Sequence, residues 1–294
     1  MGFCHRPRVP GEGRAIAAAG DRAVWTRIEG IDGKPLDLLR AGIRRQHYAP
    51  HLHAEFAVGT CTAGVEVIRY RGETHHAGPG SLVLLEPGEP HTGGPATAEG
   101  FAYRAMYPRP SLLDQGLHAQ PHFPSPVVHD PELALAVRRV HGVLSRGVDS
   151  LEAESLLVSL LAAVVDRHAA SASPVRAESR SGLLARTVMA RLSDQMTDPP
   201  TLAELAGEFG LSRYQLLRSF HDALGMPPYA WLAQHRVTHA RLLLETGQRA
   251  ADVAALVGFA DQAHLTRWFR RVVGVTPSAY RNSVQDFARR RHRF

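Results

Sequence analysis

A repeat in the last third of the chain constrains its fold more than any other sequence feature. Residues 206–231 and 254–280 carry matching residue types at eight positions, and one extra residue before Leu265 is the single change in spacing. The matched residues are Ala206, Gly210, Leu216, Arg218, Phe220, Gly225, Pro228 and Trp231 in the first copy, and Ala254, Gly258, Leu265, Arg267, Phe269, Gly274, Pro277 and Tyr280 in the second. This agreement indicates one structural unit present twice.

The spacing within each copy is typical of a helix-turn-helix unit. A small Ala four residues before a Gly allows two short helices to cross closely at a tight turn, and an apolar residue six or seven positions later packs beneath them. Thr201 with Glu204, and Ser212 with Gln215, form capping-box patterns at the starts of two helices. Asp261 is the expected N-cap of the corresponding helix in the second copy. The sequence therefore predicts two helix-turn-helix units in series.

The second helix of each unit is predicted to have a buried stripe and a polar outer face. Helical spacing places Leu216 and Phe220 inward in one copy, and Leu265 and Phe269 inward in the other. The outward positions are Arg213, Tyr214, Leu217, Arg218 and His221 in the first copy and Gln262, Ala263, Thr266, Arg267 and Arg270 in the second, with His264 near the boundary. Arg can hydrogen-bond guanine, Gln can hydrogen-bond adenine, and apolar or aromatic groups can contact a thymine methyl. A single polar face can equally be a solvated surface, but two basic copies favour contact with DNA bases.

Charge is distributed unevenly along the chain. Residues 182–294 contain 15 Arg, no Lys and 9 Asp or Glu, which accounts for the whole formal net charge of +6, whereas residues 1–181 are balanced. A basic carboxy-terminal part favours a polyanionic partner such as double-stranded DNA.

Residues 182–282 closely resemble the DNA-binding domain of AraC/XylS-type bacterial transcription regulators. The resemblance is carried by GLSRYQLLRSFHDALGMPPYAWLAQHRVTHARLLL and VAALVGFADQAHLTRWFRRVVGVTPSAYR, and most specifically by GF-x-D-Q-x-H-L-x-R-x-F and G-x-T-P-x-x-Y-R. It implies two helix-turn-helix units joined by a long helix over about 229–245, with recognition helices that enter successive major grooves about 34 Å apart. Leu217 departs from the polar base reader that the family often has at this position.

Residues 43–107 are expected to form a β-rich domain. Short alternating or β-branched segments such as VEVIRY and SLVLLE are separated by the turn-forming segments RGE, AGPG and PGEPH. In an alternating strand His51, His53 and Glu55 share one face, and His91 follows a turn that would return it to the same cavity. This set resembles the cupin barrel, and its place ahead of such a DNA-binding domain resembles the AraC-type sensor domain, in which a small barrel is a ligand pocket.

The histidine-rich set has three interpretations. Three imidazoles and a carboxylate suit Zn, Fe, Mn or Ni, but metal-dependent cupin enzymes usually place the glutamate further along the chain than Glu55 and often have an asparagine where Pro95 stands. We therefore expect no cofactor and a metal-free effector pocket. The expected effector-binding residues are His51, His53, Glu55, His91 and Tyr103. A divalent metal on His51, His53, Glu55 and His91, or purely structural histidines, are the alternatives.

The predicted fold is α+β with several domains. We expect an N-terminal arm over 1–20, a cupin-like effector-binding barrel over 21–128, a helical dimerisation segment over 129–168, a linker over 169–181, an all-α AraC-type DNA-binding domain over 182–285, and a basic tail over 286–294. Two helices are predicted in the dimerisation segment, at about 131–145 and 150–168. Their apolar residues either pack against the sheet or form a dimer seam.

The sequence predicts a cytoplasmic bacterial transcription regulator that is not an enzyme. Cys4 and Cys61 provide neither a disulfide framework nor a zinc site. The longest apolar run, residues 156–165, is about half of the ~20 residues needed to cross a bilayer, so no membrane partner is expected. The expected partners are double-stranded DNA, a small-molecule effector, RNA polymerase and a second copy in a homodimer, and activation is the commoner behaviour of the family. The alternatives are a metal-dependent cupin enzyme fused to a DNA-binding domain and an effector-independent DNA binder.

Overall fold

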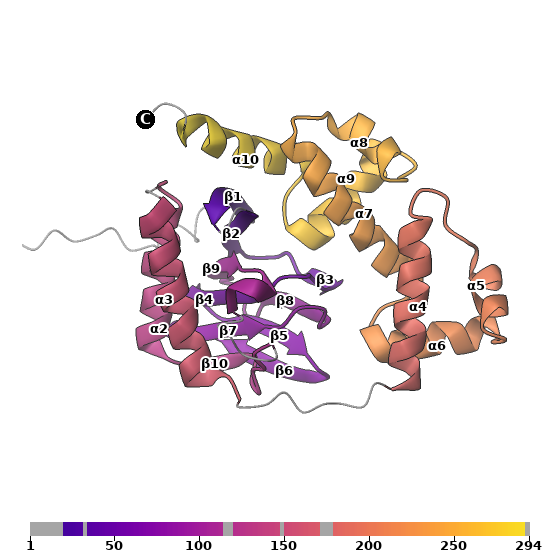
Figure 1. Ribbon diagram of the computed structural model, residues 1–294, viewed down its shortest axis with the longest axis horizontal. Helices are drawn as coiled ribbons and strands as arrows, with labels where there is room; N and C mark the ends of the chain where they lie inside the picture. The colour runs from indigo at the N-terminus through magenta and orange to yellow at the C-terminus, as the bar shows by residue number, and fades with distance from the viewer. Residues whose placement is uncertain (1–19, 32–33, 114–119, 148–149, 171–178, 292–294) are drawn as a thin grey trace, which may run out of the picture.

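The computed structural model describes residues 20–31, 34–113, 120–147, 150–170 and 179–291. A β-rich domain is followed by a helical hairpin and then by an all-helical carboxy-terminal region (Figure 1), which confirms the predicted α+β order. The expected N-terminal arm lies outside the described residues except for Gly20, and so does most of the expected linker.

Two antiparallel sheets form the amino-terminal domain. The six-stranded sheet has the order β1 (Arg22–Ile31), β2 (Lys34–Ile43), β9 (Phe101–Tyr107), β4 (Ala57–Gly64), β7 (Ser81–Leu85) and β10 (Val127–His129). The four-stranded sheet has the order β3 (Tyr48–His51), β8 (His91–Pro95), β5 (Glu66–Tyr70) and β6 (Glu73–Ala77). Alternation along β2 sends successive side chains to opposite faces of the sheet, so that Leu38 packs in one core and Leu39 in another.

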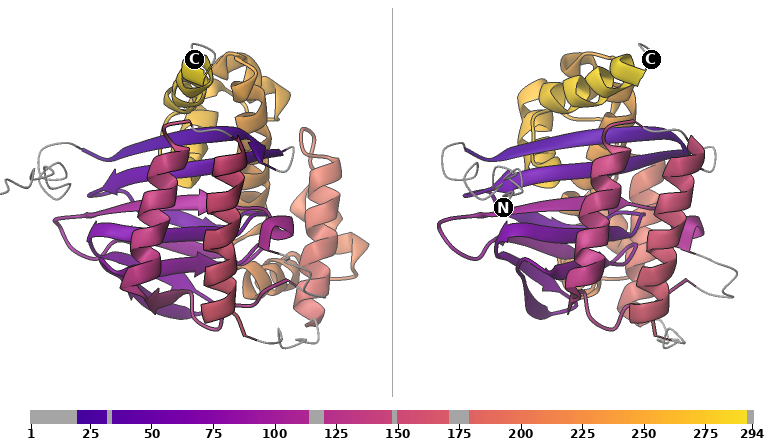
Figure 2. Two further views of the ribbon diagram at one scale, coloured as in Figure 1. Left: turned by 60° about the vertical axis from the view of Figure 1, so that its left-hand side comes forward. Right: turned by 90° about the vertical axis from the view of Figure 1, so that its left-hand side faces the viewer.

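Two helices cover the outer face of the six-stranded sheet (Figure 2). α2 (Pro131–Leu144) and α3 (Ser150–His168) match the predicted ranges closely, and the short α1 (Pro110–Leu113) precedes them. Val137 and Leu157 are fully buried in the core that these helices share with the sheet. The apolar stripe of the hairpin therefore packs within this chain, as the first of the two predicted alternatives requires.

Among the described residues 179–291, seven helices form the carboxy-terminal region. They are α4 (Arg180–Asp194), α5 (Leu202–Glu208), α6 (Arg213–Leu224), α7 (Pro228–Glu245), α8 (Ala250–Leu256), α9 (Gln262–Val273) and α10 (Pro277–Arg291). Helices α5 and α6 form the first helix-turn-helix unit, and α8 and α9 form the second. The long α7 joins the two units at the predicted position.

The local signals read from the sequence are confirmed in both units. Capping boxes at Thr201 and Ser212 start α5 and α6, and the Asp261 side chain accepts a hydrogen bond from the His264 backbone N–H at 2.6 Å. The C-caps Gly225 and Gly274 have φ of 65° and 84°, a left-handed conformation that favours glycine.

The two units differ in what lies beneath them. α4, α5, α6 and the start of α7 enclose a core built around Leu216 and Phe220, and Leu52 of the barrel packs at its edge. Leu265 and Phe269 of the second unit instead belong to a core that continues into the β-domain through Trp25 and Tyr48. The second unit is thus docked on the barrel along a continuous apolar contact.

Candidate functional site

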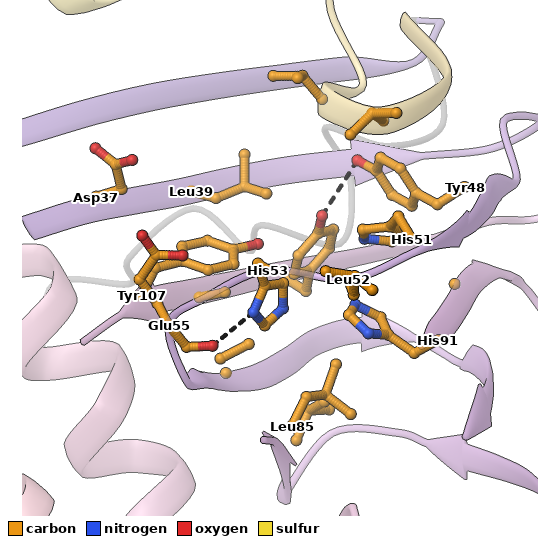
Figure 3. Close-up of a pocket in the computed structure, with 18 of the residues that line it drawn as sticks. Asp37, Leu39, Tyr48, His51, Leu52, His53, Glu55, Leu85, His91 and Tyr107 are labelled. Carbon is orange, nitrogen blue, oxygen red and sulfur yellow. Dashed lines mark hydrogen bonds between the residues drawn. The ribbon is translucent and has the colours of Figure 1, made fainter. Parts of the chain in front are cut away.

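A cavity of about 160 Å³ lies between the two sheets. All five predicted effector-binding residues, His51, His53, Glu55, His91 and Tyr103, line it. Figure 3 shows the three imidazoles gathered on one side of the cavity, below the tyrosine side chains. The sequence pattern therefore identified one wall of a real cavity.

The three histidines form a compact cluster. The ring centroids of His51 and His91 are 4.2 Å apart, and those of His53 and His91 are 4.9 Å apart. In each ring Nδ1 lies within hydrogen-bond distance of a backbone carbonyl oxygen, 2.8 Å from Ala49, 2.6 Å from Glu55 and 3.0 Å from Glu89. Because a carbonyl can only accept, Nδ1 carries the proton and Nε2 is left as an acceptor. Nε2 of His53 is buried without a hydrogen-bond partner among the described residues.

The prediction that His51, His53 and Glu55 share one face of an alternating strand is partly wrong. β3 ends at His51, so His53 and Glu55 do not continue an alternating strand. His51 reaches His91 because the two residues are register partners across β3 and β8, and His53 is placed by its bond to the Glu55 carbonyl oxygen. The Glu55 contribution to this cluster is thus its backbone. In the described part of the chain no three His, Cys, Asp or Glu side chains are arranged to hold a metal ion.

Burial keeps the three imidazoles and the Glu66 carboxyl group of the pocket uncharged near neutral pH. Burial, together with the neighbouring His51, lowers the pKa of His53 to about 4, and it also lowers the pKa of His51 and His91. Burial raises the pKa of Glu66 to about 8, so this carboxyl group is mostly protonated at pH 7. The pocket consequently offers neutral imidazole acceptors and a carboxylic acid that can donate.

Tyrosines and Glu66 complete the polar lining. Tyr103 donates a hydrogen bond to the Tyr48 hydroxyl oxygen at 3.2 Å, and Tyr107 stands edge-on to the His53 ring at a centroid distance of 5.5 Å. The residues predicted for the pocket did not include Tyr48, Tyr107 and Glu66. The alternation in VEVIRY was a usable signal, because it places Glu66 on the same buried face as Ile68.

The remaining wall of the pocket comes from the carboxy-terminal region. Val237, Thr238 and Arg241 of α7, with Val272 and Val273 of α9, line the same cavity. These residues were not predicted as pocket residues, because nothing local in the sequence connects α7 or α9 with the barrel.

A set of ion pairs holds this wall in place. Arg241 and Arg27 both bind the Asp37 carboxylate, and Arg27 also binds Glu245. Against the effect of burial, the two guanidinium groups keep the pKa of Asp37 below its usual range. Tyr280 donates a hydrogen bond to Glu245 at 2.7 Å and so ties α10 to the same network.

Close backbone contacts accompany the ion pairs. The Trp25 indole N–H donates to the Val273 carbonyl oxygen at 3.1 Å, and the Gln46 amide donates to the Arg270 carbonyl oxygen at 2.8 Å. A Cβ atom on Gly274 would lie only 2.6 Å from the Tyr48 hydroxyl oxygen. The C-terminal end of α9 therefore touches the barrel directly.

The outer faces of α6 and α9 are placed largely as predicted. The exposed residues are Arg213, Tyr214, Arg218 and His221 on α6 and Gln262, Ala263, Arg267 and Arg270 on α9. Leu217 and Thr266 are half-buried, and Nε2 of the half-buried His264 lies 3.1 Å from the Tyr229 hydroxyl group. Tyr214 exposes 70% of its surface, which is unusual for a large aromatic residue and fits a contact surface.

A sheet-enclosed pocket joined to two helix-turn-helix units defines a DNA-binding transcription regulator with a ligand-binding domain. Residues 34–161 match the AraC-like ligand binding domain, and residues 205–283 match the helix-turn-helix domain family. The chain belongs to the AraC family of transcription regulators. Members of this family are not enzymes, so the alternative of a metal-dependent cupin enzyme is set aside.

Known relatives agree with this assignment. The chain is 27% identical over 226 residues to the uncharacterised HTH-type transcriptional regulator YbfI of Bacillus subtilis, covering 75% of this chain and 82% of the relative. It is 29% identical over 233 residues to the arabinose operon regulatory protein of Salmonella typhimurium, covering 74% and 80%. The crystal structure of unsaturated fatty acid bound ToxT from Vibrio cholerae aligns with a TM-score of 0.53 at 13% identity, covering 92% of this chain and 98% of that one, and shows the same fold.

Among the described residues, no helix is both long enough and apolar enough to cross a membrane.

Proposed function

We propose that a small-molecule effector binds in the pocket and changes how the second helix-turn-helix unit is held on the barrel. The observation that carries this proposal is the shared wall: Arg241 and Val272 line the pocket and belong to α7 and α9. A ligand that contacts this wall differently in the docked and released arrangements would shift the balance between them. DNA affinity would change because α9 supplies one of the two DNA-contacting faces.

The chemistry of the pocket indicates the kind of effector. Three imidazole Nε2 atoms accept hydrogen bonds, and the one on His53 is buried without a partner in the described part of the chain. The pocket is also lined by apolar and aromatic side chains such as Leu39, Ile68 and Tyr107. Its charged lining residues Asp37 and Arg241 neutralise each other in an ion pair. These features favour an uncharged molecule that carries hydroxyl or N–H donors on one side and apolar surface on the other.

The outer faces of α6 and α9 are proposed to contact double-stranded DNA in successive major grooves. The proposed base-contacting residues are Arg213, Tyr214, Leu217, Arg218, Gln262, Ala263, Thr266, Arg267 and Arg270. His264 is a secondary candidate, because its side chain is already engaged with Tyr229. Arg271 stacks on Trp268 at 4.9 Å and is proposed to contact a phosphate group.

Two further partners are proposed, a second copy of this chain and RNA polymerase. A homodimer would use the apolar residues that α2 and α3 leave exposed, among them Leu135, Leu151 and Val158, since the buried stripe is occupied by the sheet. We propose activation of transcription through RNA polymerase in the bacterial cytoplasm, which is the commoner behaviour of the family.

Selection of the full chain against a random duplex pool tests the DNA-binding part of this proposal. The expected result is enrichment of sites with two conserved blocks about one helical turn apart. Arg218→Ala should relax one block and Arg267→Ala the other, while Arg69→Ala in the barrel changes neither. Binding without enrichment that is lost uniformly as salt rises would contradict sequence-specific recognition.

The effector part is tested by screening uncharged small molecules for an increase in the unfolding temperature of the full chain. A true effector should stabilise the wild type, should lose most of this effect with Tyr103→Phe or His53→Ala, and should change operator affinity. A folded protein whose operator affinity is indifferent to every pocket ligand and to both substitutions would favour the effector-independent alternative.

A further inference from the structure

One acidic side chain faces the effector pocket without a partner. Glu66 of β5 exposes 8% of its surface and lines the pocket together with Ile68, which lies on the same face of the strand. Its carboxyl group forms no hydrogen bond and no ion pair with any residue that the structure describes. Burial of a carboxyl group disfavours its charged form unless a cation lies beside it.

Gly93 of β8 keeps open the space that the Glu66 carboxyl group occupies. Gly93 lines the pocket and is the register partner of Ile68 on β5 and of Tyr48 on β3. A Cβ atom on Gly93 would lie 2.8 Å from Oε1 of Glu66 and 3.6 Å from Cδ2 of Tyr48. The carboxyl group and the tyrosine ring therefore flank the same small space, and any larger residue at this position would collide with the carboxyl group.

The described residues do not supply a positive charge for Glu66. Arg241 carries the one guanidinium group among the described residues that line the pocket, and it is paired with Asp37. Burial raises the pKa of Glu66 to about 8, and no cationic side chain of the described residues opposes this effect. The cation that would match this carboxyl group must therefore come from a ligand.

Tyrosine side chains surround the place for such a cation. Burial raises the pKa of Tyr48, Tyr103 and Tyr107, and the charge of Glu66 raises all three further, so the carboxyl group lies near these rings. Aromatic ring faces attract cations. The hydroxyl oxygens of Tyr48 and Tyr103, 3.2 Å apart and joined by a dashed line in Figure 3, can also accept hydrogen bonds from N–H groups. This combination suits an ammonium group.

We propose that the effector carries one protonated amino group, which pairs with the Glu66 carboxylate beside Tyr48. This inference rests on the proposed function, because it concerns the ligand of the same pocket. Most of the pocket suits an uncharged molecule, but Glu66 can neutralise a single positive charge. The apolar body of the ligand would pack against residues such as Leu39 and Ile68. A Cβ atom on Gly274 would lie 2.6 Å from the Tyr48 hydroxyl oxygen, so the amino group would bind next to the end of α9.

The ion pair can form only with the release of a proton. At pH 7 the Glu66 carboxyl group is mostly protonated and a simple alkylamine is an ammonium ion. Binding of the ammonium ion therefore sends the Glu66 proton to solvent. The affinity must rise with pH, by up to about tenfold per pH unit, and level off above pH 8. A neutral ligand that accepts a hydrogen bond from protonated Glu66 would behave in the opposite way, with an affinity that falls as Glu66 loses its proton.

The other described groups around Glu66 keep their charge between pH 6.5 and 8. Burial lowers the pKa of the three imidazoles, and it raises the pKa of the Cys61 thiol to about 11 and that of Tyr48 to about 12. The groups that face this part of the pocket from the neighbouring strands and from α7 are Asp37, Tyr48, His51, His53, Cys61, His91, Tyr103, Tyr107 and Arg241. A rise of affinity with pH in this range is thus assigned to Glu66.

Calorimetric titration of the full chain with benzylamine, 2-phenylethylamine and cyclohexylmethylamine tests this proposal, with the corresponding alcohols as uncharged analogues. We expect amine binding at one site that is at least about tenfold tighter at pH 8 than at pH 6.5. At pH 7 the heat should depend on the ionisation enthalpy of the buffer as release of nearly one proton requires.

Two variants separate Glu66 from general charge attraction. Glu66→Gln keeps the size of the side chain and should weaken amine binding at least about tenfold, while alcohol binding is retained. Glu73→Gln removes an exposed carboxylate from the neighbouring strand and should leave the amine affinity unchanged.

Three results would overturn the inference. They are no binding of any of the amines at millimolar concentration, an affinity that does not rise between pH 6.5 and 8, and equal amine affinity in Glu66→Gln and the wild type. The pH profile needs only the wild-type chain, so it decides the question even when a variant does not fold.

The inference and the proposed function can fail separately, because operator affinity is measured with and without the bound ligand. An amine that binds through Glu66 without changing operator affinity would support the ammonium site and refute control of DNA binding by the pocket. An alcohol that binds and changes operator affinity, while no amine binds, would support that control and refute the ammonium site.

Discussion

The two helix-turn-helix units have nearly the same local structure but differ in how they pack against the barrel. In both, a side-chain cap starts the second helix, a left-handed glycine ends it, and a proline begins the helix that follows. The core of the first unit meets the barrel at Leu52, whereas the second unit shares one continuous core with the barrel and lines the pocket. The matched positions thus determine the helix-turn-helix architecture of both copies, while contacts outside the matched positions join the second copy to the pocket.

The largest expected effect comes from truncating the matched buried phenylalanines. Phe220→Ala and Phe269→Ala each remove a fully buried ring and should each cost about 3 to 5 kcal/mol of unfolding free energy. Phe269→Ala should also destabilise the barrel, because its core is continuous with the second unit, whereas Phe220→Ala should not. Urea unfolding measures both effects when it is monitored by backbone circular dichroism and by the environment of Trp25 in the barrel. A barrel that is insensitive to Phe269→Ala would contradict the difference drawn between the two units.

Removing one carboxylate should destabilise the protein far more at the second unit than at the first. Asp37→Ala leaves Arg27 and Arg241 without their shared partner and should cost about 3 kcal/mol, because breaking one side of a buried ion pair is strongly destabilising. The control is Asp222→Ala, which removes the exposed partner of Arg218 in the first unit and should cost no more than about 0.5 kcal/mol. Equal unfolding midpoints for the two variants would show that the ion pairs do not hold the second unit on the barrel.

Substitutions on the DNA-facing surface should distinguish base contacts from phosphate contacts. Arg267→Ala should weaken binding to the selected site by about 1 to 3 kcal/mol and relax the sequence preference at one position. Arg271→Ala should weaken binding to all sequences alike and reduce the salt slope by about one. Titrations on matched and mismatched duplexes at two salt concentrations measure this difference, and identical behaviour of the two variants would refute the assigned faces.

The smallest expected effect is a pH dependence that only the pocket shows. The pKa of Glu66 is raised to about 8, so between its ordinary value and pH 8 the folded chain keeps a proton that the unfolded chain has lost. The Glu66 contribution to stability must then fall as the pH rises through this window, by up to about 1.4 kcal/mol per pH unit. Near pH 6.5 the histidines are about half protonated in the unfolded chain, whereas burial keeps the pocket histidines neutral in the folded chain, so their contribution raises stability as the pH rises and opposes that of Glu66. The Glu66 effect is therefore measured as a difference between the wild type and a variant.

Substitution isolates the contribution of Glu66. Between pH 6.5 and 8 the unfolding free energy of Glu66→Gln should rise relative to that of the wild type, while Glu73→Gln, at an exposed position of the neighbouring strand, should follow the wild type. The same slope in all three proteins would assign the pH dependence to other groups.

Features that depend on local sequence could be predicted well. Caps, glycine turns and helical stripes are determined within a few residues, so Thr201, Ser212, Asp261 and Gly274 predicted the helix boundaries correctly. The polar faces of α6 and α9 followed from helical spacing, although Leu217 and Thr266 are half-buried because each lies beside its inward-facing neighbour.

Features that depend on distant contacts could not be predicted. Trp25 and Val273 are joined by a hydrogen bond across 248 positions, and no periodicity signals such a pair. For the same reason the pocket wall formed by α7 and α9 was not predicted, and the pocket was expected to belong to the barrel alone. The His51, His53 and His91 cluster was found for a partly wrong reason, since a register pair and a carbonyl bond assemble it in place of continuous alternation.

Amide hydrogen exchange on the full chain tests most directly whether the pocket controls the second unit alone. Val83→Phe places a larger side chain in the pocket from β7, away from α7 and α9, and stands in for a bound ligand. We predict a changed exchange rate along α9 and the facing β3, with α6 indistinguishable from the wild type. Unchanged exchange in α9, or an equal change in α6 and α9, would contradict the coupling between the pocket and the docked unit.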